Sequence, residues 1–175
     1  MLIFLLFTVS AQIHADPYRL NPGDRLHVSV WGEENLQSDV RILPDGSISI
    51  PLVGILHVSG MTLEMVTQRI RNLLEPYIPD ASVTVTVTET GGNLVYVLGK
   101  VTNPGVYPLI RRTDVLQALS LAGGLARFAK EDEIRILRRV NGKPIAIPFD
   151  FAQILRGNSL ESNILLQSGD TIIVP

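Results

Sequence analysis

Residues 21–31 read Asn-Pro-Gly-Asp-Arg-Leu-His-Val-Ser-Val-Trp, a turn followed at once by a strand pattern. Proline presets φ for the second position of a turn, and glycine supplies a positive φ at the third, so a tight turn is predicted at residues 21–24. Every second residue from Leu26 to Val30 is apolar, which predicts a half-buried strand. The sequence therefore predicts a tight turn that leads directly into a half-buried strand.

The rest of the first half predicts an α+β unit. Asp45-Gly46 lies between the strand-like segments 40–43 and 47–50, which is a strong hairpin signal. Residues 62–76 have apolar residues at helical spacing, with Thr62 as the predicted N-terminal cap and prolines at the end. Valine and threonine then alternate through residues 83–88, which predicts a strand with valines facing inward.

The second half predicts strands around a single main helix. Predicted strands at 94–98 and 106–109 flank a turn at 103–105, and a helix from a Thr113 cap ends at Gly123-Gly124. Predicted strands at 134–137 and 145–147 flank Asn141-Gly142, which is another hairpin dipeptide. Asp150 is predicted to cap a short helix. Ser168-Gly169-Asp170 leads into a last predicted strand at 171–174. This order is that of a β-grasp, although periodicity alone does not fix the topology.

Composition excludes several classes of function. The chain has 175 residues, of which 46% are hydrophobic and 18% charged, so it is long enough for one ordinary domain or two small ones. It has no cysteine, which excludes disulfides, thiolate metal sites, cysteine nucleophiles and an acylated cysteine anchor. The net charge of −2 gives no bulk attraction to nucleic acid, which is therefore not an expected partner.

A division near Gly91-Gly92 gives two small domains of opposite charge. Residues 16–90 carry five basic and ten acidic side chains, a net charge of −5, whereas residues 91–175 carry ten basic and seven acidic, a net charge of +3. The asymmetry is consistent with chance and solvated surfaces. It is also consistent with different partners for the two halves, or with contact between them in a head-to-tail assembly.

Residues 1–15 have the pattern of a secretory signal peptide. An apolar run from Leu2 to Val9 precedes small residues, with cleavage possible after Ala11 or Ala15. No Lys or Arg precedes the run, so either the amino terminus supplies the charge or translation starts further upstream; the alternative structure is a buried N-terminal strand. We expect export from the cytoplasm.

The sequence offers no convergent set of catalytic groups, and no catalytic residue, cofactor or metal site is predicted. His27 and His57 lack metal-ligand spacing and are predicted to be surface or loop residues. Asp24, Asp45 and Asp170 each adjoin a glycine in a turn, where a carboxylate accepts backbone N–H groups.

Basic residues form two short clusters in the second half. Arg111-Arg112 and Arg138-Arg139, with Lys143 nearby, are candidates for contact with the polymer or a partner, such as an acidic glycan or a phosphorylated tail. A solvated surface is the simpler interpretation.

Two series of motifs resemble known domains. Residues 18–26 (YRLNPGDRL), 28–32 (VSVWG), 44–48 (PDGSI), 51–54 (PLVG), 60–62 (GMT) and the strand at 83–87 resemble the polysaccharide export domain of the polysaccharide biosynthesis/export (Wza-like) family. Residues 98–101 (LGKV), 103–107 (NPGVY), 114–119 (DVLQAL) and 122–125 (AGGL) resemble the soluble-ligand-binding β-grasp (SLBB) domain. Together the resemblances cover nearly all of the chain after residue 15.

The resemblance implies a periplasmic component of an outer-membrane translocon for capsule or exopolysaccharide in a Gram-negative bacterium. In that family protomers form a ring, the polymer passes through its lumen, and an inner-membrane polysaccharide co-polymerase is the expected partner. No bond is made or broken, so an enzyme is not expected.

This sequence departs from the family pattern at several points. Asn21 stands where the family often has glycine, and Lys100 stands where it often has an acidic residue. The cysteine that carries a lipid in the family is missing, and no amphipathic helix follows Pro175. We therefore expect an unlipidated periplasmic ring, unless the start codon is misassigned, that docks to a separate outer-membrane β-barrel. A glycan-binding module and a scaffold without a conducting lumen are the alternatives.

The motif positions are predicted to make the fold rather than an active site. They are Pro22, Gly23, Asp24, Asp45, Gly46, Pro51, Gly54, Gly99, Pro104, Gly105, Gly123 and Gly124. A β-branched residue at Gly23 or Gly46 is expected to cost at least about 1 kcal/mol, because it would force a positive φ.

Overall fold

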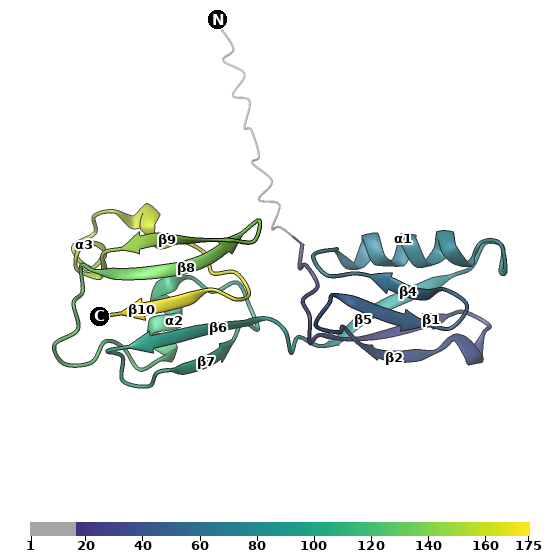
Figure 1. Cartoon of the computed structure of the whole chain (residues 1–175), viewed down its shortest axis with the longest axis horizontal. Helices are drawn as coiled ribbons and strands as arrows, with labels where there is room; N and C mark the ends of the chain where they lie inside the picture. Colours follow the sequence, from purple (N-terminus) through teal and green to yellow (C-terminus); the bar gives the residue numbers. More distant parts are fainter. Residues whose placement is uncertain (1–16) are drawn as a thin grey trace, which may run out of the picture.

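The computed structural model describes residues 17–175, and the predicted signal peptide lies outside them. Two separate hydrophobic cores organise this part of the chain, one from Leu20 to Val85 and one from Val95 to Val174. Figure 1 shows the two sets of elements at opposite ends of the long axis, with one connection between them. The α+β class predicted from the sequence is confirmed.

The first domain combines an antiparallel sheet, a hairpin and a helix. The sheet has the order β2-β1-β5, with β1 at Arg25–Val30, β2 at Ser38–Arg41 and β5 at Val83–Glu89. The 3₁₀ helix η1 (Glu34–Leu36) joins β1 to β2. A hairpin of β3 (Ser47–Ile50) and β4 (Gly54–His57) precedes helix α1 (Leu63–Leu74).

Alternation along β1 and the apolar stripe of α1 build the first core. Leu26, Val28 and Val30 are buried on one side of the sheet, and Val66 and Ile70 of α1 are buried in the same core. The predicted cap is confirmed, since the Thr62 hydroxyl accepts the Met65 N–H at 3.3 Å.

The predicted hairpin around Asp45-Gly46 is wrong in its pairing. The turn itself forms, because Gly46 N–H donates to the Leu43 carbonyl at 2.8 Å. However, β2 pairs with β1, whereas β3 pairs with β4 through a turn at residues 51–53. The Asp-Gly turn therefore joins two different sheets. His57 also lies at the end of β4, not in the predicted loop.

The second domain has a five-stranded mixed sheet in the order β7-β6-β10-β8-β9. Its strands are β6 (Leu94–Gly99), β7 (Gly105–Pro108), β8 (Ile134–Val140), β9 (Lys143–Phe149) and β10 (Thr171–Val174). The last strand pairs with β6 in parallel and with β8 antiparallel, which places the end of the chain in the middle of the sheet. The short helices are α2 (Val115–Leu121), α3 (Phe151–Leu155) and η2 (Leu160–Ser162).

The start of α2 corrects one predicted cap. Asp114, not Thr113, accepts the Gln117 N–H at 2.8 Å, and the Gln117 side chain accepts the Asp114 N–H in return. Thr113 is buried one residue earlier, where its hydroxyl donates to the Arg111 carbonyl. A carboxylate competes better for the helix N-terminus because it is charged.

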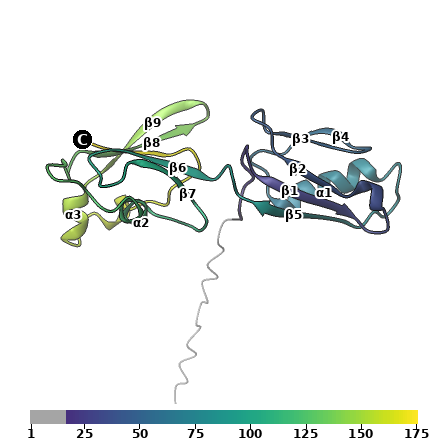
Figure 2. The same ribbon diagram turned by 90° about the horizontal axis from the view of Figure 1, so that it is seen from below.

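Helix α2 covers only one face of the second sheet. Val115, Ala118 and Leu119 are buried in the second core, and Figure 2 shows α2 on one side of the strands with the other side bare. No helix between residues 17 and 175 is long and apolar enough to cross a membrane.

Candidate functional site

Two equivalent turns begin β1 and β10. Residues 20–28 (LNPGDRLHV) and 166–174 (LQSGDTIIV) share leucine, glycine, aspartate and valine at the same spacing. In each turn the aspartate Oδ2 accepts the N–H three residues earlier at 2.8 Å, in one from Asn21 to Asp24 and in the other from Gln167 to Asp170. The prediction that these carboxylates hold backbone N–H groups is confirmed.

Asp24 is buried at the edge of the first domain. Besides the turn, its carboxylate accepts the Tyr18 hydroxyl at 2.6 Å and the Gly92 N–H at 2.9 Å. Burial, together with the hydrogen bond to this carboxylate, raises the pKa of the Tyr18 hydroxyl well above its usual value of 10.0. Tyr18 therefore stays a hydrogen-bond donor over the whole physiological range.

Gly92 links the two turns. Its N–H is bonded to Asp24, and its carbonyl accepts the Ser168 hydroxyl at 2.7 Å from the equivalent turn. A Cβ built on Gly92 would lie 2.1 Å from the Pro22 carbonyl oxygen, so no side chain fits there. The connection between the domains is thus held from both sides.

Asp170 forms a buried ion pair with one of the four predicted contact arginines. Arg138 Nη2 lies 2.6 Å from Asp170 Oδ2, with the two side chains 13% and 1% exposed. The Arg138 guanidinium also donates to the Leu165 carbonyl at 2.9 Å. Arg138 is therefore used inside the domain and is not available to a polymer.

The other three arginines are exposed but do not form a defined site. Arg111 and Arg112 lie in the loop between β7 and α2, whereas Arg139 lies on β8 with one nitrogen donating to the Gly142 carbonyl at 3.2 Å. Their contact with a polymer stays a prediction.

The remaining motif positions lie mainly in turns. Asp45 accepts both the Ser47 hydroxyl at 2.7 Å and the Ser47 N–H at 3.0 Å; these two bonds lower the pKa of its exposed carboxyl. The φ angle is positive at Gly23, Gly46, Gly54, Gly99, Gly123 and Gly124. Pro51 lies in the β3–β4 turn, Pro104 lies between β6 and β7, and Gly105 begins β7.

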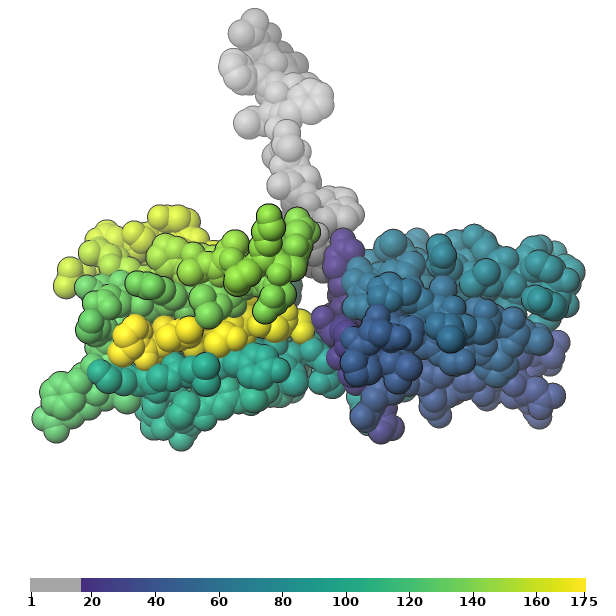
Figure 3. Space-filling view, viewed as in Figure 1, coloured from purple at the N-terminus to yellow at the C-terminus, as the bar shows by residue number. Residues whose placement is uncertain are grey.

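The uncovered side of the second sheet carries a cluster of apolar residues, with Thr171 and Arg135 on the same side. Tyr96, Leu98, Val106, Leu137 and Ile173 make up this apolar sheet face, and the first four are 37–53% exposed. Register places them together, since Tyr96 lies opposite Val106 and Leu98 lies opposite Ile173. Figure 3 shows this side, with β10 (yellow) between β6 (teal) and the green strands β8 and β9.

The uncovered side of the first sheet is polar. His27, Ser29, Thr84 and Thr86 alternate with the buried residues of β1 and β5 and line this side. His27 Nδ1 lies 2.8 Å from Asp39 Oδ1 across the β1–β2 pair. The uncovered sides of the two sheets thus differ in polarity, because that of the first domain is rich in hydroxyl groups and that of the second domain carries the apolar cluster.

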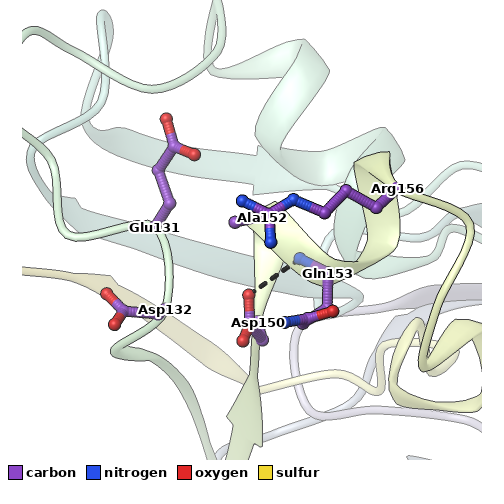
Figure 4. Close-up of a pocket in the computed structure, with 6 residues that line it drawn as sticks. All are labelled: Glu131, Asp132, Asp150, Ala152, Gln153 and Arg156. Carbon is purple, nitrogen blue, oxygen red and sulfur yellow. Dashed lines mark hydrogen bonds between the residues drawn. The ribbon is translucent and has the colours of Figure 1, made fainter.

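A cavity of about 360 Å³ lies beside α3, where acidic side chains gather (Figure 4). Asp150 is used as the helix cap, accepting the Gln153 N–H at 2.9 Å, and the carboxylates of Glu131 and Asp132 point in different directions. Among residues 17–175, no group of three or more His, Cys, Asp or Glu side chains could hold a metal ion.

Sequence reasoning missed two features, the repeated turn and the apolar sheet face, and it did not single out the exposed Trp31 as a site residue. The repeat was visible as Leu-x-x-Gly-Asp-x-x-x-Val at residues 20–28 and 166–174. The apolar face had a signal in Leu94–Leu98, where every residue is apolar although only alternate residues face the core. Trp31 continues the outward-facing positions of β1, which marks it as exposed.

Each half of the chain matches a known family model. The family model described as "Polysaccharide biosynthesis/export protein" matches residues 13–88, and the SLBB domain model matches residues 94–148. The polysialic acid transport protein KpsD of Escherichia coli is 32% identical over 62% of this chain, and the exopolysaccharide production protein ExoF of Rhizobium meliloti is 35% identical over 65%. The EPS I polysaccharide export outer membrane protein EpsA of Ralstonia nicotianae is 26% identical over 91% of this chain.

The chain spans less than half the length of these relatives, with matches that cover 20% of KpsD, 30% of ExoF and 48% of EpsA. The two models match in the order that the sequence motifs predict and together cover about three quarters of the chain. The chain belongs to the polysaccharide biosynthesis/export family, with a polysaccharide export domain followed by an SLBB domain.

Proposed function

We propose that this chain is a periplasmic component of an outer-membrane polysaccharide export system. Its copies would assemble into a ring-like conduit that docks to a separate outer-membrane β-barrel and receives polymer from an inner-membrane co-polymerase. Family membership and the printed names of the relatives, which concern polysaccharide transport and export, support this proposal. The role is conduction of the polymer and not chemistry on it.

The observation that carries the proposal is the apolar sheet face. Residues 94–98 of β6 are all apolar, a pattern typical of a strand in a sheet that is covered on both sides, yet α2 covers only one side here. Contiguous exposed apolar surface of this kind marks an interaction site. A second copy of the chain is the occupant that the charges favour.

Charge complementarity supports a head-to-tail contact. The apolar sheet face carries two basic residues, Arg135 and Arg139, which share its side of β8 with Leu137. The first half of the chain has a net charge of −5. Contact between the basic apolar face of one copy and the acidic half of the next is heterologous, and a heterologous contact generates a ring when its rotation closes.

The mass of the mature protein in solution tests the assembly. We expect light scattering, combined with intact mass spectrometry, to find an unlipidated chain in a discrete high-order oligomer, alone or with a co-purifying β-barrel. Leu137→Glu should dissociate it, because it replaces an apolar contact with a negative charge that would face the acidic half of the next copy.

Leu155→Glu is the matched control, because Leu155 is 68% exposed on α3, outside the apolar sheet face. It should leave the mass unchanged. A monomer in every fraction would contradict the ring and favour a glycan-binding or scaffold role. An unchanged high-order mass for Leu137→Glu would contradict the apolar sheet face as the contact between copies.

A further inference from the structure

A polar cleft lies at the end of β1 in the polysaccharide export domain. It has a volume of about 430 Å³ and is formed by the end of β1, the loop that follows it and the start of β5. Its polar lining residues are Ser29, Glu33, Glu34, Gln37, Ser82 and Thr84. The cleft continues the hydroxyl-rich side of the first sheet, since Ser29 lies opposite Thr84 in the β1–β5 pair.

Trp31 is the aromatic wall of this cleft and the only tryptophan of the chain. Trp31 is 87% exposed, while its backbone N–H donates to the Ser82 carbonyl at 2.9 Å. The loop after it is anchored by the buried Leu36 in η1. A large aromatic side chain is therefore held in water on a fixed backbone, beside polar groups.

The polar side chains of the cleft are available to a ligand. Between residues 17 and 175, no hydrogen bond from another protein group engages the side chains of Ser29, Glu34, Gln37 or Thr84. The hydroxyl and amide groups can both donate and accept hydrogen bonds here, and the carboxylates accept them. Glu33 and Glu34 are the charged residues of the lining, so the cleft disfavours a polyanion.

We propose that this cleft is a binding subsite for neutral pyranose units of the exported polysaccharide. A pyranose ring has C–H groups on one face and hydroxyls around its edge. The Trp31 ring would pack against the C–H face, and the carboxylate, amide and hydroxyl groups would bond the hydroxyls. Val30, the other apolar side chain of the lining, is buried, so the groups beside Trp31 that can reach a ligand are polar.

This inference rests on the proposed export function and adds the residues that contact the polymer. Because Trp31 is the only tryptophan of the chain, tryptophan fluorescence reports on the cleft directly. The assembled protein is titrated with oligosaccharides cut from the polysaccharide that the host secretes, separated into neutral and acidic fractions. We expect a saturable shift of Trp31 emission to shorter wavelength with the neutral fraction, and at least about tenfold weaker binding of the acidic one.

Variants assign the binding to the cleft. By calorimetry Trp31→Ala should lose at least about tenfold in affinity for the neutral fraction, whereas Trp31→Phe, which keeps an aromatic face, should lose less. Tyr77→Ala is the matched control, because Tyr77 is 63% exposed beyond the end of α1 in the same domain and outside the cleft. It should bind as the unchanged protein does.

Three results would overturn the subsite: no binding of the neutral fraction, equal binding by Trp31→Ala, or dissociation of the oligomer by Trp31→Ala. The last would make Trp31 a contact between copies. Any of these leaves the export function standing if deletion of the gene still blocks secretion. Normal secretion after deletion would instead refute the export function itself.

Discussion

At the scale of single residues, the connection between the domains depends on a position where only glycine fits. Gly92→Ala would place a Cβ 2.1 Å from the Pro22 carbonyl oxygen. We expect it to lower the free energy of unfolding by about 1–3 kcal/mol, as overpacking does. Urea unfolding measures this, with Gly105→Ala as the control, because a Cβ there would meet nothing nearer than 4.0 Å. Equal stability of the two variants would contradict the close packing.

The ion pair between Arg138 and Asp170 predicts a large effect of removing one partner. Asp170→Asn leaves the guanidinium of a largely buried arginine without its counter-charge. We expect a loss of about 3–5 kcal/mol in unfolding free energy. Arg139→Ala, an exposed change on the same strand, should cost no more than about 0.5 kcal/mol. A small effect of Asp170→Asn in thermal and urea unfolding would show that the pair is not structural.

The Asp45 turn predicts a dependence of stability on pH. Hydrogen bonds from Ser47 lower the pKa of Asp45 below its usual value of 3.8 in the folded protein. The charged form therefore stabilises the fold above that value, and this contribution is lost as pH falls through the folded-state pKa. Urea midpoints of the unchanged protein and Asp45→Asn, measured from about pH 7 down to about pH 2, should converge at the acidic end. A constant difference would contradict the prediction.

Among the secondary-structure elements, helix α2 depends on a reciprocal cap. Asp114→Ala removes the acceptor of the Gln117 N–H and the charge at the helix N-terminus. The expected cost is about 1 kcal/mol. Ser120→Ala, at an exposed position of the same helix, should stay within about 0.5 kcal/mol. If both variants unfold at the same urea concentration, Asp114 is not the cap.

Local pattern predicts the elements better than their partners. The alternation in β1 and β5, the apolar stripe of α1 and the Asn141-Gly142 hairpin could be predicted because each is a property of neighbouring residues. The pairing of β3 with β4 could not, because an Asp-Gly turn fixes the turn itself and not the sheet to which each arm belongs. The cap of α2 was missed by one residue because Thr113 and Asp114 are both good capping residues.

At the scale of the whole molecule, the sequence predicts two domains and their family but not their surfaces. The charges of the two halves and the order of the motifs are properties of the linear chain, so the sequence alone determines them. The apolar sheet face and the Trp31 cleft combine residues from distant strands, such as Leu98 with Ile173 or Ser29 with Thr84. These surfaces therefore depend on the sheet order, which local pattern does not determine. The turns that hold Gly92 likewise meet only in the folded chain.

We propose that these surfaces build an assembly that conducts the polymer, and a measurement of secretion tests this proposal most directly. Polysaccharide is measured outside the cell and in the periplasm of a host whose gene is deleted and then replaced by the unchanged chain or by Leu137→Glu. We expect polymer to leave the cell only with the unchanged chain and to collect in the periplasm with the variant, although the variant folds. Normal secretion in the deletion strain would contradict it.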